Sequence, residues 1–468
     1  MIDLKPFKDK TFAVFGLGAS GLASVKALKK AGAKVLAWDD SDENRLKASR
    51  AGAPLADLTL ADWSAIDALV LSPGVPLTHP LPHWTVGMAE AHNVEIIGDV
   101  ELLARAQRST PKVGITGTNG KSTTTALIGH ILQASGKTAE VGGNLGQPVL
   151  TFKPLEDDGI YVLELSSYQL DLSHDLDLDV AVLLNVTPDH LDRHGGMVGY
   201  LKAKRRIFDG GKENRTAVIG MDDAFCHSVY DELKSDNKHR VVPISGHQAV
   251  PGGVYALDGQ LIDDLEGKEE AVLDLTTVAT LTGRHNHQNA AAAYASVRSL
   301  GLGKDDAIGA MTTFPGLAHR QELVAVIDGI SYINDSKATN AEAAARALTS
   351  YANIYWIAGG RAKDGGIEGL GETLASVRHA YLIGEAAEAF AVTLEGRVAN
   401  THSGDLETAV NQARERALTD GTGGVVLLSP ACASFDQFAN FELRGEAFKN
   451  IVAALPGERQ AVLAGGAS

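Results

Sequence analysis

The stretch Gly114-Ile-Thr-Gly-Thr-Asn-Gly-Lys-Ser-Thr-Thr-Thr125 follows an apolar run typical of a strand and opens a segment typical of a helix. Backbone N–H groups at such a turn, together with the N-terminus of the helix, bind phosphate oxygens. In this pattern Lys121 places its ammonium on the β- and γ-phosphates of a nucleotide, and Ser122 offers a hydroxyl to Mg²⁺. Gly117 and Gly120 allow the backbone to approach the phosphates closely. The stretch therefore predicts a nucleotide-binding α/β domain.

The standard P-loop pattern is not complete here. Gly-x-x-x-x-Gly-Lys requires a glycine at the position that Ile115 occupies. The alternative interpretation is a glycine-rich turn whose lysine is solvated. The nucleotide interpretation is favoured because Thr-Asn-Gly-Lys-Ser-Thr lies between a strand pattern and a helix pattern.

Length and composition bound the remaining possibilities. The chain has 468 residues, which suggests about three domains. Hydrophobic residues make up 44% and charged residues 21%, which excludes a fibrous or wholly disordered chain. The formal net charge of -16 argues against nonspecific binding to nucleic acid or anionic membranes. Two cysteines, a charged N-terminal segment and the lack of a long apolar run predict a cytoplasmic protein without a membrane span.

Short apolar runs alternate with helix-like segments along the chain, which predicts parallel sheets covered by helices. We predict three α/β domains: a Rossmann-like domain over residues 1–104, a central P-loop ATPase-like domain over 105–316, and a Rossmann-like domain over 317–468. Residues 251–269 are expected to form a turn-rich β insertion. The stretch 312–319 is the predicted linker before the third domain.

A second glycine-rich turn, Gly16-Leu-Gly18-Ala-Ser-Gly21, follows the first apolar run of the chain. It fits the Gly-x-Gly-x-x-Gly fingerprint, and Asp39 ends the next strand pattern, near the place of an acid that binds a ribose. The fingerprint alone is compatible with NAD, FAD or another nucleotide diphosphate conjugate. The alternative is a tight turn between strand and helix, with Asp39 capping backbone N–H groups.

Acidic and histidine side chains follow two further strand patterns. Glu164 ends a buried run, a position at which nucleotide enzymes hold Mg²⁺, and the alternative is a salt bridge at a sheet edge. His190 and His194 are spaced i, i+4, so zinc is an alternative, but no cysteine or third ligand with zinc spacing is apparent. We favour an oxygen-rich magnesium site with one histidine over a solvated loop. The basic run at 202–206 is compatible with a solvated helical face, and its spacing alone does not single out Lys204.

Eight motifs, in order along the three predicted domains, resemble the Mur ligases. They are Gly117-Thr-Asn-Gly-Lys-Ser122, Gly143-Asn-Leu-Gly146, Leu163-Glu-Leu-Ser-Ser167, Asn185-Val-Thr-Pro-Asp-His190, Arg284-His-Asn-His-Gln-Asn289, Gly316-Leu-Ala-His-Arg320, Asn334-Asp-Ser-Lys-Ala-Thr-Asn340 and Leu428-Ser-Pro-Ala-Cys-Ala-Ser-Phe-Asp-Gln-Phe438. The last three are similar to the members that use D-glutamate. The resemblance implies an ATP-dependent ligase that adds D-glutamate to UDP-N-acetylmuramoyl-L-alanine through an acyl phosphate, releasing ADP and phosphate, in peptidoglycan precursor synthesis.

The resemblance also implies ATP and two Mg²⁺ ions as cofactors. Its catalytic residues correspond to Lys121, His190 and Lys204, the last as a carbamylated lysine that provides anionic oxygen ligands. The implied metal ligands are Ser122, Glu164, His190 and Lys204. Asn286 and Asn289 are implied around the adenine, and an amide can pair with its N6 and N7. The full set of implied ATP contacts is Gly117, Thr118, Asn119, Gly120, Lys121, Ser122, Thr123, Asn286, Asn289, Arg320 and Asp335.

The substrate contacts implied by the resemblance lie in all three predicted domains. Those for the UDP-sugar substrate are Ala19, Ser20, Asp39, Asp40 and Gly74 for the uridine diphosphate, and Asn144 for the muramoyl-alanine. Those for D-glutamate are Lys337, Thr339, Lys363, Ser434 and Phe441. Two positions depart from the family pattern. Asp40 replaces a small hydroxylic residue, and Arg361 stands where the family has aspartate, so that a second cation is available to a carboxylate.

Three alternative functions were weighed against the sequence. One is a ligase of the same architecture with another substrate, such as a folylpolyglutamate synthetase-like enzyme. The second is an NAD-dependent oxidoreductase built on the first glycine-rich turn, which leaves Lys121, Glu164 and Lys204 without a role. The third is a nonenzymatic nucleotide-binding regulator. We expect a monomer whose partners are the two substrates and that binds no nucleic acid.

Overall fold

The computed structural model describes residues 1–211, 215–281, 283–363, 365–421 and 423–460. The chain divides into two compact units, Met1–Phe314 and a second that begins at Pro315, and each is described by itself. The boundaries of the three domains, near 104 and 316, stay predictions. Among the described helices, none combines the length and apolar character that crossing a membrane requires. Cys226 and Cys432 are buried free thiols.

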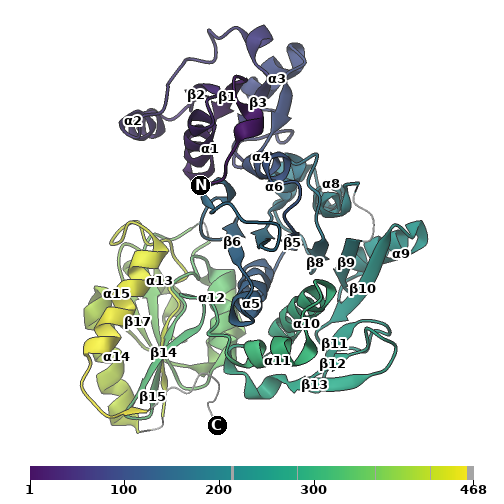
Figure 1. The fold of residues 1–468 in the computed structure, drawn as a ribbon. Coiled ribbons are helices and arrows are strands. Elements are labelled where there is room, and N and C mark those ends of the chain that lie inside the picture. Colours follow the sequence, from purple (N-terminus) through teal and green to yellow (C-terminus); the bar gives the residue numbers. More distant parts are fainter. Residues whose placement is uncertain (212–214, 282, 364, 422, 461–468) are drawn as a thin grey trace. The chain divides into compact units, whose positions relative to one another are not determined.

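The first unit begins with a parallel sheet of four strands within the described residues, in the order β2-β1-β3-β4 (Figure 1). Alternate residues of β1 enter two cores: Phe12 and Val14 lie in one, Ala13 and Phe15 in the other. Burial on both faces explains why these strands read as continuous apolar runs. The elements are η1 Lys5–Phe7, β1 Thr11–Phe15, α1 Ala19–Lys30, β2 Lys34–Trp38, α2 Asp42–Arg50, η2 Trp63–Ala65, β3 Ala68–Leu71, α3 Trp84–Ala91, β4 Glu95–Ile97 and α4 Asp99–Ala106.

The same unit continues into a larger sheet, with nine strands in the described part of the chain. Its order is β13-β12-β11-β10-β9-β8-β5-β7-β6. The strand β12 pairs antiparallel with both of its neighbours, β11 and β13, and every other neighbouring pair of described strands is parallel. Its strands are β5 Lys112–Thr116, β6 Ala139–Gly143, β7 Ile160–Glu164, β8 Val180–Leu183, β9 Arg215–Gly220, β10 His239–Ser245, β11 Val254–Leu257, β12 Gln260–Asp263 and β13 Glu270–Asp274. The hairpin of β11 and β12 lies within the stretch predicted as a β insertion.

Helices cover both faces of this sheet. Side chains of α5, α10 and α11 share one core with the sheet, and Figure 1 shows the three helices together. The helices are η3 Val149–Thr151, α5 Lys121–Ala134, α6 Ser167–Asp171, α7 Leu191–His194, α8 Met197–Arg205, η4 Arg206–Phe208, α9 Ala224–Asp236, η5 Leu275–Thr277, η6 Ala279–Leu281, α10 Arg284–Ser299 and α11 Lys304–Thr312.

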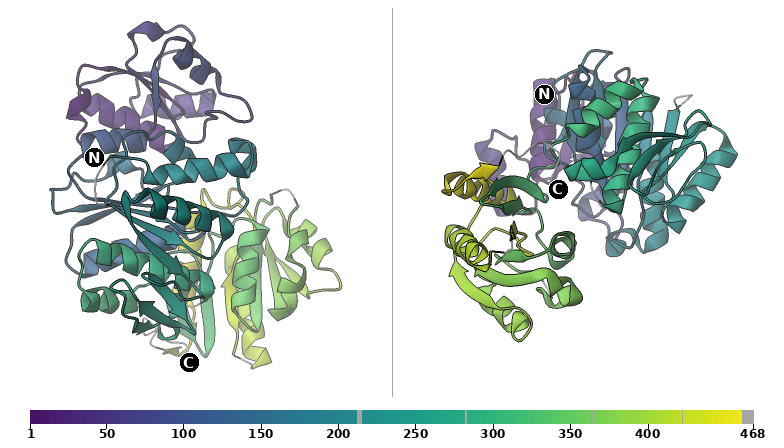
Figure 2. Two further views of the ribbon diagram at one scale, coloured as in Figure 1. Left: turned by 90° about the vertical axis from the view of Figure 1, so that its right-hand side faces the viewer. Right: turned by 90° about the horizontal axis from the view of Figure 1, so that it is seen from below.

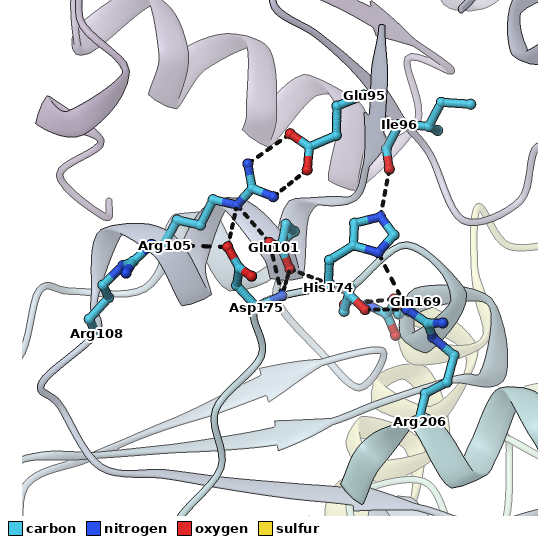
Figure 3. Close-up of polar contacts among 10 residues, drawn as sticks. Glu95, Ile96, Glu101, Arg105, Arg108, Gln169, His174, Asp175 and Arg206 are labelled. Atoms are coloured by element: carbon cyan, nitrogen blue, oxygen red, sulfur yellow. Dashed lines mark hydrogen bonds and ion pairs between the residues drawn. The ribbon is translucent and has the colours of Figure 1, made fainter. Parts of the chain in front are cut away.

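A buried polar network joins the two sheets of the first unit (Figure 3). Glu101, on α4, is fully buried and accepts hydrogen bonds from the backbone N–H groups of His174, at 2.7 Å, and Asp175. Arg105 donates to Glu101 Oε1 at 2.6 Å and also pairs with Glu95. These charge-assisted bonds fix the last strand and helix of the first sheet against the segment after α6.

The second unit holds one sheet, in which seven strands are described. The order is β18-β17-β16-β19-β15-β14-β20, with the first five strands parallel. Side chains of α12 and α13 pack on one face and those of α14 and α15 on the other. Figure 2 shows the ribbon of this unit, in green to yellow, from two further sides. The elements are β14 Glu322–Ile327, β15 Ile330–Asn334, α12 Ala341–Ser350, β16 Ile354–Gly359, η7 Glu368–Ser376, β17 Val377–Ile383, α13 Ala387–Leu394, β18 Asn400–Gly404, α14 Leu406–Asp420, β19 Val425–Leu428, α15 Phe441–Ala454 and β20 Arg459–Gln460.

Candidate active site

The phosphate loop joins β5 to α5 in the middle of the nine-stranded sheet. Gly117 and Gly120 have φ of 154° and 85°, in the region that glycine alone adopts without strain. A Cβ at Gly120 would also lie 2.2 Å from Asn289 Oδ1. Gly120 is the N-cap residue of α5 and has no side chain that could accept hydrogen bonds from the first N–H groups of the helix. Backbone N–H groups of the first turn are therefore available to an anion.

The two asparagines predicted around the adenine lie beside this loop, on α10. Asn289 is 2% exposed and accepts a hydrogen bond from Thr124 Oγ1 at 3.2 Å. It donates to Asn286 Oδ1, also at 3.2 Å. The helix therefore brings the predicted base site to the predicted phosphate site.

Two lysines converge on one carbonyl oxygen of the loop. Lys121 Nζ and Lys204 Nζ each donate to Gly117 O at 2.8 Å. Lys204 is 1% exposed, and its Nζ lies 4.6 Å from the centre of the Tyr200 ring. Burial, and then the charge of Lys121, lowers the pKa of Lys204 well below its usual range. The amine of Lys204 is thus held in an environment that favours its neutral, nucleophilic form.

Glu164 ends β7, the neighbour of β5, and is 2% exposed. Its Oε1 accepts a hydrogen bond from Asn144 Nδ2 at 2.7 Å, and the backbone N–H of Asn144 donates to Glu164 O. Its Oε2 is buried and has no hydrogen-bond partner among the described residues. An orphaned buried carboxylate oxygen is a ligand that fits a hard cation. Ser122, the other predicted metal ligand of the loop, is half-buried in the first turn of α5.

The segment that carries His190 is fastened to the phosphate loop. Thr118 N donates to Asn185 O at 2.9 Å, and Thr118 Oγ1 donates to Thr187 O at 3.1 Å. His190 itself is at φ 51°, and its ring lies 3.6 Å from the Asp189 carboxylate. The structure therefore places His190 on a loop next to the phosphate loop, at the same edge of the sheet.

His194 has a different environment from His190. It is buried, with Nε2 at 2.9 Å from Ser167 Oγ and Nδ1 at 3.4 Å from the Asp171 carboxylate. Burial lowers the pKa of His194 to about 4. Both ring nitrogens thus face protein partners, and the described residues hold no cluster of three or more His, Cys, Asp or Glu side chains suited to a metal ion. The zinc alternative finds no third ligand among them.

The first glycine-rich turn packs against the turn that follows β3. A Cβ at Gly16 would lie 2.6 Å from Ser72 Cβ, and Ser72 Oγ donates to Gly16 O. Ala19 and Ser20 begin α1. Gly74, in the same turn as Ser72, accepts a hydrogen bond from Arg193 at 3.1 Å.

The two aspartates predicted at the uridine diphosphate have protein partners. Asp39 accepts hydrogen bonds from Leu17 N at 2.6 Å and Ser41 N at 2.8 Å. Asp40 pairs with His83 Nε2 at 2.9 Å. The Asp39 carboxylate holds the glycine-rich turn and the start of α2, as the capping alternative describes.

Four of the five residues predicted at D-glutamate lie on loops of the second unit, and the fifth, Phe441, is the first residue of α15. These loops follow β15, β16 and β19, adjacent parallel strands whose carboxyl ends share one edge. Lys337 Nζ lies 5.8 Å from the centre of the Phe441 ring. Arg361 and Ala433 exchange two backbone hydrogen bonds, which join the Lys363 loop to the Ser434 loop. Thr339 bonds by its backbone to Lys337 O.

The remaining predicted residues of this unit surround the same edge. Asp335 follows β15 and is 4% exposed, and burial raises its pKa to about 7 while Ser429 Oγ donates to it at 2.7 Å. Arg320 is exposed. Arg361, the departure from the family pattern, pairs with Glu385 at 3.0 Å. Its guanidinium thus has a carboxylate partner within the protein.

Comparisons with known proteins agree with this geometry. A family model described as the Mur ligase middle domain matches residues 115–297, and one described as the Mur ligase, glutamate ligase domain matches residues 319–432. A Caulobacter vibrioides (strain NA1000 / CB15N) protein named UDP-N-acetylmuramoylalanine--D-glutamate ligase is 52% identical over 461 residues, or 97% of this chain and 98% of the relative. A Rhodospirillum rubrum protein of the same name is 51% identical over 472 residues, or 100% of this chain and 99% of the relative.

The chain belongs to the Mur ligase family. Solved structures support the fold of this Mur ligase. UDP-N-acetylmuramate-alanine ligase MurC from Thermotoga maritima has a TM-score of 0.56 at 16% identity, covering 95% of this chain and 99% of that chain. MurF from Acinetobacter baumannii has a TM-score of 0.55 at 20% identity, covering 75% and 79%. The predicted three-domain α/β fold and the predicted family are confirmed.

Two residues that position the site of this Mur ligase were not assigned from its sequence. Asn185 accepts from Asn119 N at 2.9 Å and donates to Asn119 O and to Gln288. Tyr200 OH lies 3.2 Å from Thr118 Oγ1. Asn185 carries a signal in the sequence, because it follows β8 at the strand end where the phosphate loop also lies. Tyr200 carries none, since its role depends on a contact across 82 residues.

Proposed function

We propose that this Mur ligase joins D-glutamate to UDP-N-acetylmuramoyl-L-alanine at the expense of ATP in peptidoglycan precursor synthesis. The observation that carries the proposal is the meeting of three features at one sheet edge. These are the phosphate loop, the two lysines on Gly117 O, and the unpaired Oε2 of Glu164. The names of relatives about half identical along nearly the whole chain identify the substrates.

The chemistry explains why these residue types are needed. A carboxylate is a poor electrophile, so one of its oxygens first attacks the γ-phosphorus of ATP and the bond to ADP breaks. The amine of D-glutamate then attacks the acyl carbon, phosphate leaves, and the amine loses a proton. Negative charge develops on the phosphoryl oxygens in the first step, where Lys121 and the N–H groups of α5 are placed to stabilise it.

The residues present fit two magnesium ions. Ser122 and Glu164 would hold one, and His190 and a carbamylated Lys204 the other, and the ions would neutralise phosphate charge. A carbamate forms when the nitrogen of a neutral lysine amine attacks the carbon of CO₂ and then loses a proton to solvent. Lys204 suits this addition because it is buried beside a second lysine, with no carboxylate within ion-pair distance in the part of the chain described.

The other binding sites follow the family pattern. The turns at Gly16–Gly21 and Ser72–Gly74 would bind the uridine diphosphate, and the loops after β15, β16 and β19 would bind D-glutamate. Arg320 and Asp335, both in the second unit, would contact ATP. We expect the enzyme to act as a monomer in the cytoplasm.

Phosphate release across amino acids and acceptors tests the function. We expect release that requires ATP, UDP-N-acetylmuramoyl-L-alanine and D-glutamate together, and none with L-glutamate. Release with L-glutamate and a folate would replace the proposal by the folylpolyglutamate synthetase alternative. Consumption of NADH would favour the oxidoreductase, and ATP binding without turnover on any amino acid would favour the regulator.

Replacing Glu164 by glutamine is expected to lower kcat by about a hundredfold and to raise the Mg²⁺ concentration needed for half-maximal rate. The change keeps the shape and the bond from Asn144 but removes the charge from Oε2. Rates measured across a magnesium titration check this. Glu140→Gln, on the neighbouring strand β6, is the matched control and should leave the titration unchanged. An unaltered Mg²⁺ requirement in Glu164→Gln would remove Glu164 from the metal site.

A further inference from the structure

Arg444 lies inside the second unit as the fourth residue of α15, and is 1% exposed. Its Nε donates to Ser336 Oγ at 3.0 Å, and its Nη2 donates to Ser336 O at 2.9 Å and Cys432 O at 3.0 Å. Its Nη1 is buried and, among the described residues, has no hydrogen-bond partner. No carboxylate in the described chain comes within ion-pair distance of this guanidinium. Arg414, which is also buried in this unit, differs because it pairs with Asp328.

A buried cation without an anion is costly for folding. Desolvation of an unpaired charge opposes folding, and a carboxylate partner would offset that cost. Burial accordingly lowers the pKa of Arg444 to about 10. The position close to the N-terminus of α15 adds a further penalty, because the helix dipole disfavours cations there. Because desolvation and the helix dipole both disfavour this cation, we look for its role in function and not in stability.

The contacts of Arg444 reach each loop of the predicted glutamate pocket. Ser336 precedes Lys337 in the chain, and its Oγ donates to Phe441 O at 2.8 Å. Cys432 lies two residues before Ser434. On the third loop, a Cβ at Gly360 would lie 3.3 Å from Arg444 Nη1, so that glycine leaves this nitrogen uncovered by a side chain.

We propose that Arg444 is a positioning and specificity-determining residue for the amino-acid substrate. It fixes the three loops that carry Lys337, Lys363 and Ser434, and its charge, which no carboxylate of the described chain meets at ion-pair distance, favours a substrate with two carboxylates. Ser434 Oγ is also buried and has no hydrogen-bond partner within the described ranges, so the pocket holds a hydroxyl as well as a guanidinium with unused hydrogen-bonding capacity. The inference rests on the proposed function, because it concerns the D-glutamate pocket of that reaction.

Steady-state phosphate release by Arg444→Met and Arg444→Lys tests the inference, with each substrate varied in turn. In Arg444→Met we expect KM for D-glutamate to rise at least about tenfold, because both the charge and the loop contacts are lost. KM for ATP should change less than about twofold. Arg444→Lys keeps the charge but not the planar fork of donors, so it should recover part of the loss.

Arg414→Met is the matched control. Arg414 is 9% exposed in the same unit, but it donates to Asp328 Oδ2 at 2.6 Å and to Tyr332 OH at 3.2 Å, so its charge is compensated. Its replacement should lower the thermal midpoint and leave KM for D-glutamate unchanged. A merely structural role of Arg444 would give this same pattern.

An unchanged KM for D-glutamate in folded Arg444→Met, or an equal rise in the KM of all three substrates, would overturn the inference. If Arg444→Met does not fold, Arg444→Lys decides, and an unchanged KM for D-glutamate in that variant overturns it. Wild-type enzyme that releases no phosphate with D-glutamate would instead overturn the proposed function, so that the two failures are distinguishable.

Discussion

Replacing Lys121 by alanine is expected to lower kcat by about a thousandfold while leaving KM for the UDP-sugar substrate within about threefold. Lys121 begins α5 and donates to the backbone carbonyls of Gly117 and Thr118, which aim its ammonium along the loop that would hold the phosphates. The charge it meets grows as the phosphoryl group is transferred. Its contribution is therefore larger in the transition state than in the bound substrate, and the loss appears mainly in kcat.

The matched control for this change is Lys137→Ala. Lys137 is exposed beyond the other end of α5, so its removal tests the loss of one positive charge from the same region without touching the loop. Kinetics of phosphate release with saturating ATP check both variants. A Lys121→Ala enzyme that keeps more than about a tenth of the wild-type kcat would contradict a catalytic role.

Much of the fold could be predicted because buried parallel strands give continuous apolar runs in the sequence. The apolar runs at residues 11–15 and 180–183 coincide with β1 and β8, whose side chains are almost all buried. β6 was not predicted, because Ala139–Gly143 holds a glutamate and two glycines and lies at the edge of its sheet. β14 was also missed, since four of its six residues are only half-buried and it pairs antiparallel.

Some residues of the candidate site could likewise be located from local sequence pattern, and others could not. Lys121, Ser122 and Glu164 could be predicted because each lies at the end of a strand or the start of a helix, where local pattern fixes its position. Lys204 could not be chosen from spacing. The structure separates it from its neighbour, because Lys204 is buried against Gly117 O while Lys202 is exposed. Arg444 gave no signal at all, since its significance lies in the absence of a carboxylate partner among the described residues.

Replacing Lys204 by alanine is expected to lower kcat at least about a hundredfold, because the proposed carbamate would be lost as an anionic ligand beside the phosphates. Wild-type enzyme depleted of CO₂ should lose activity to a similar extent and regain it when bicarbonate is added. Lys204→Ala should not respond to bicarbonate, because it has no amine to carbamylate. The pair of measurements separates a carbamate from a lysine that acts by its positive charge, since such a lysine would need no CO₂.

Lys202→Ala is the control for this experiment, because Lys202 lies on the same helix and is exposed. It should keep both its activity and its response to bicarbonate. Carbon-13 NMR with labelled bicarbonate gives a readout independent of turnover, as a carbamate signal should appear in wild type and Lys202→Ala but not in Lys204→Ala. Full activity in Lys204→Ala, or the same carbamate signal in it as in wild type, would contradict the assignment. In either case the burial of Lys204 beside Lys121 would have to be explained by the hydrogen bond to Gly117 O and the packing on Tyr200 alone.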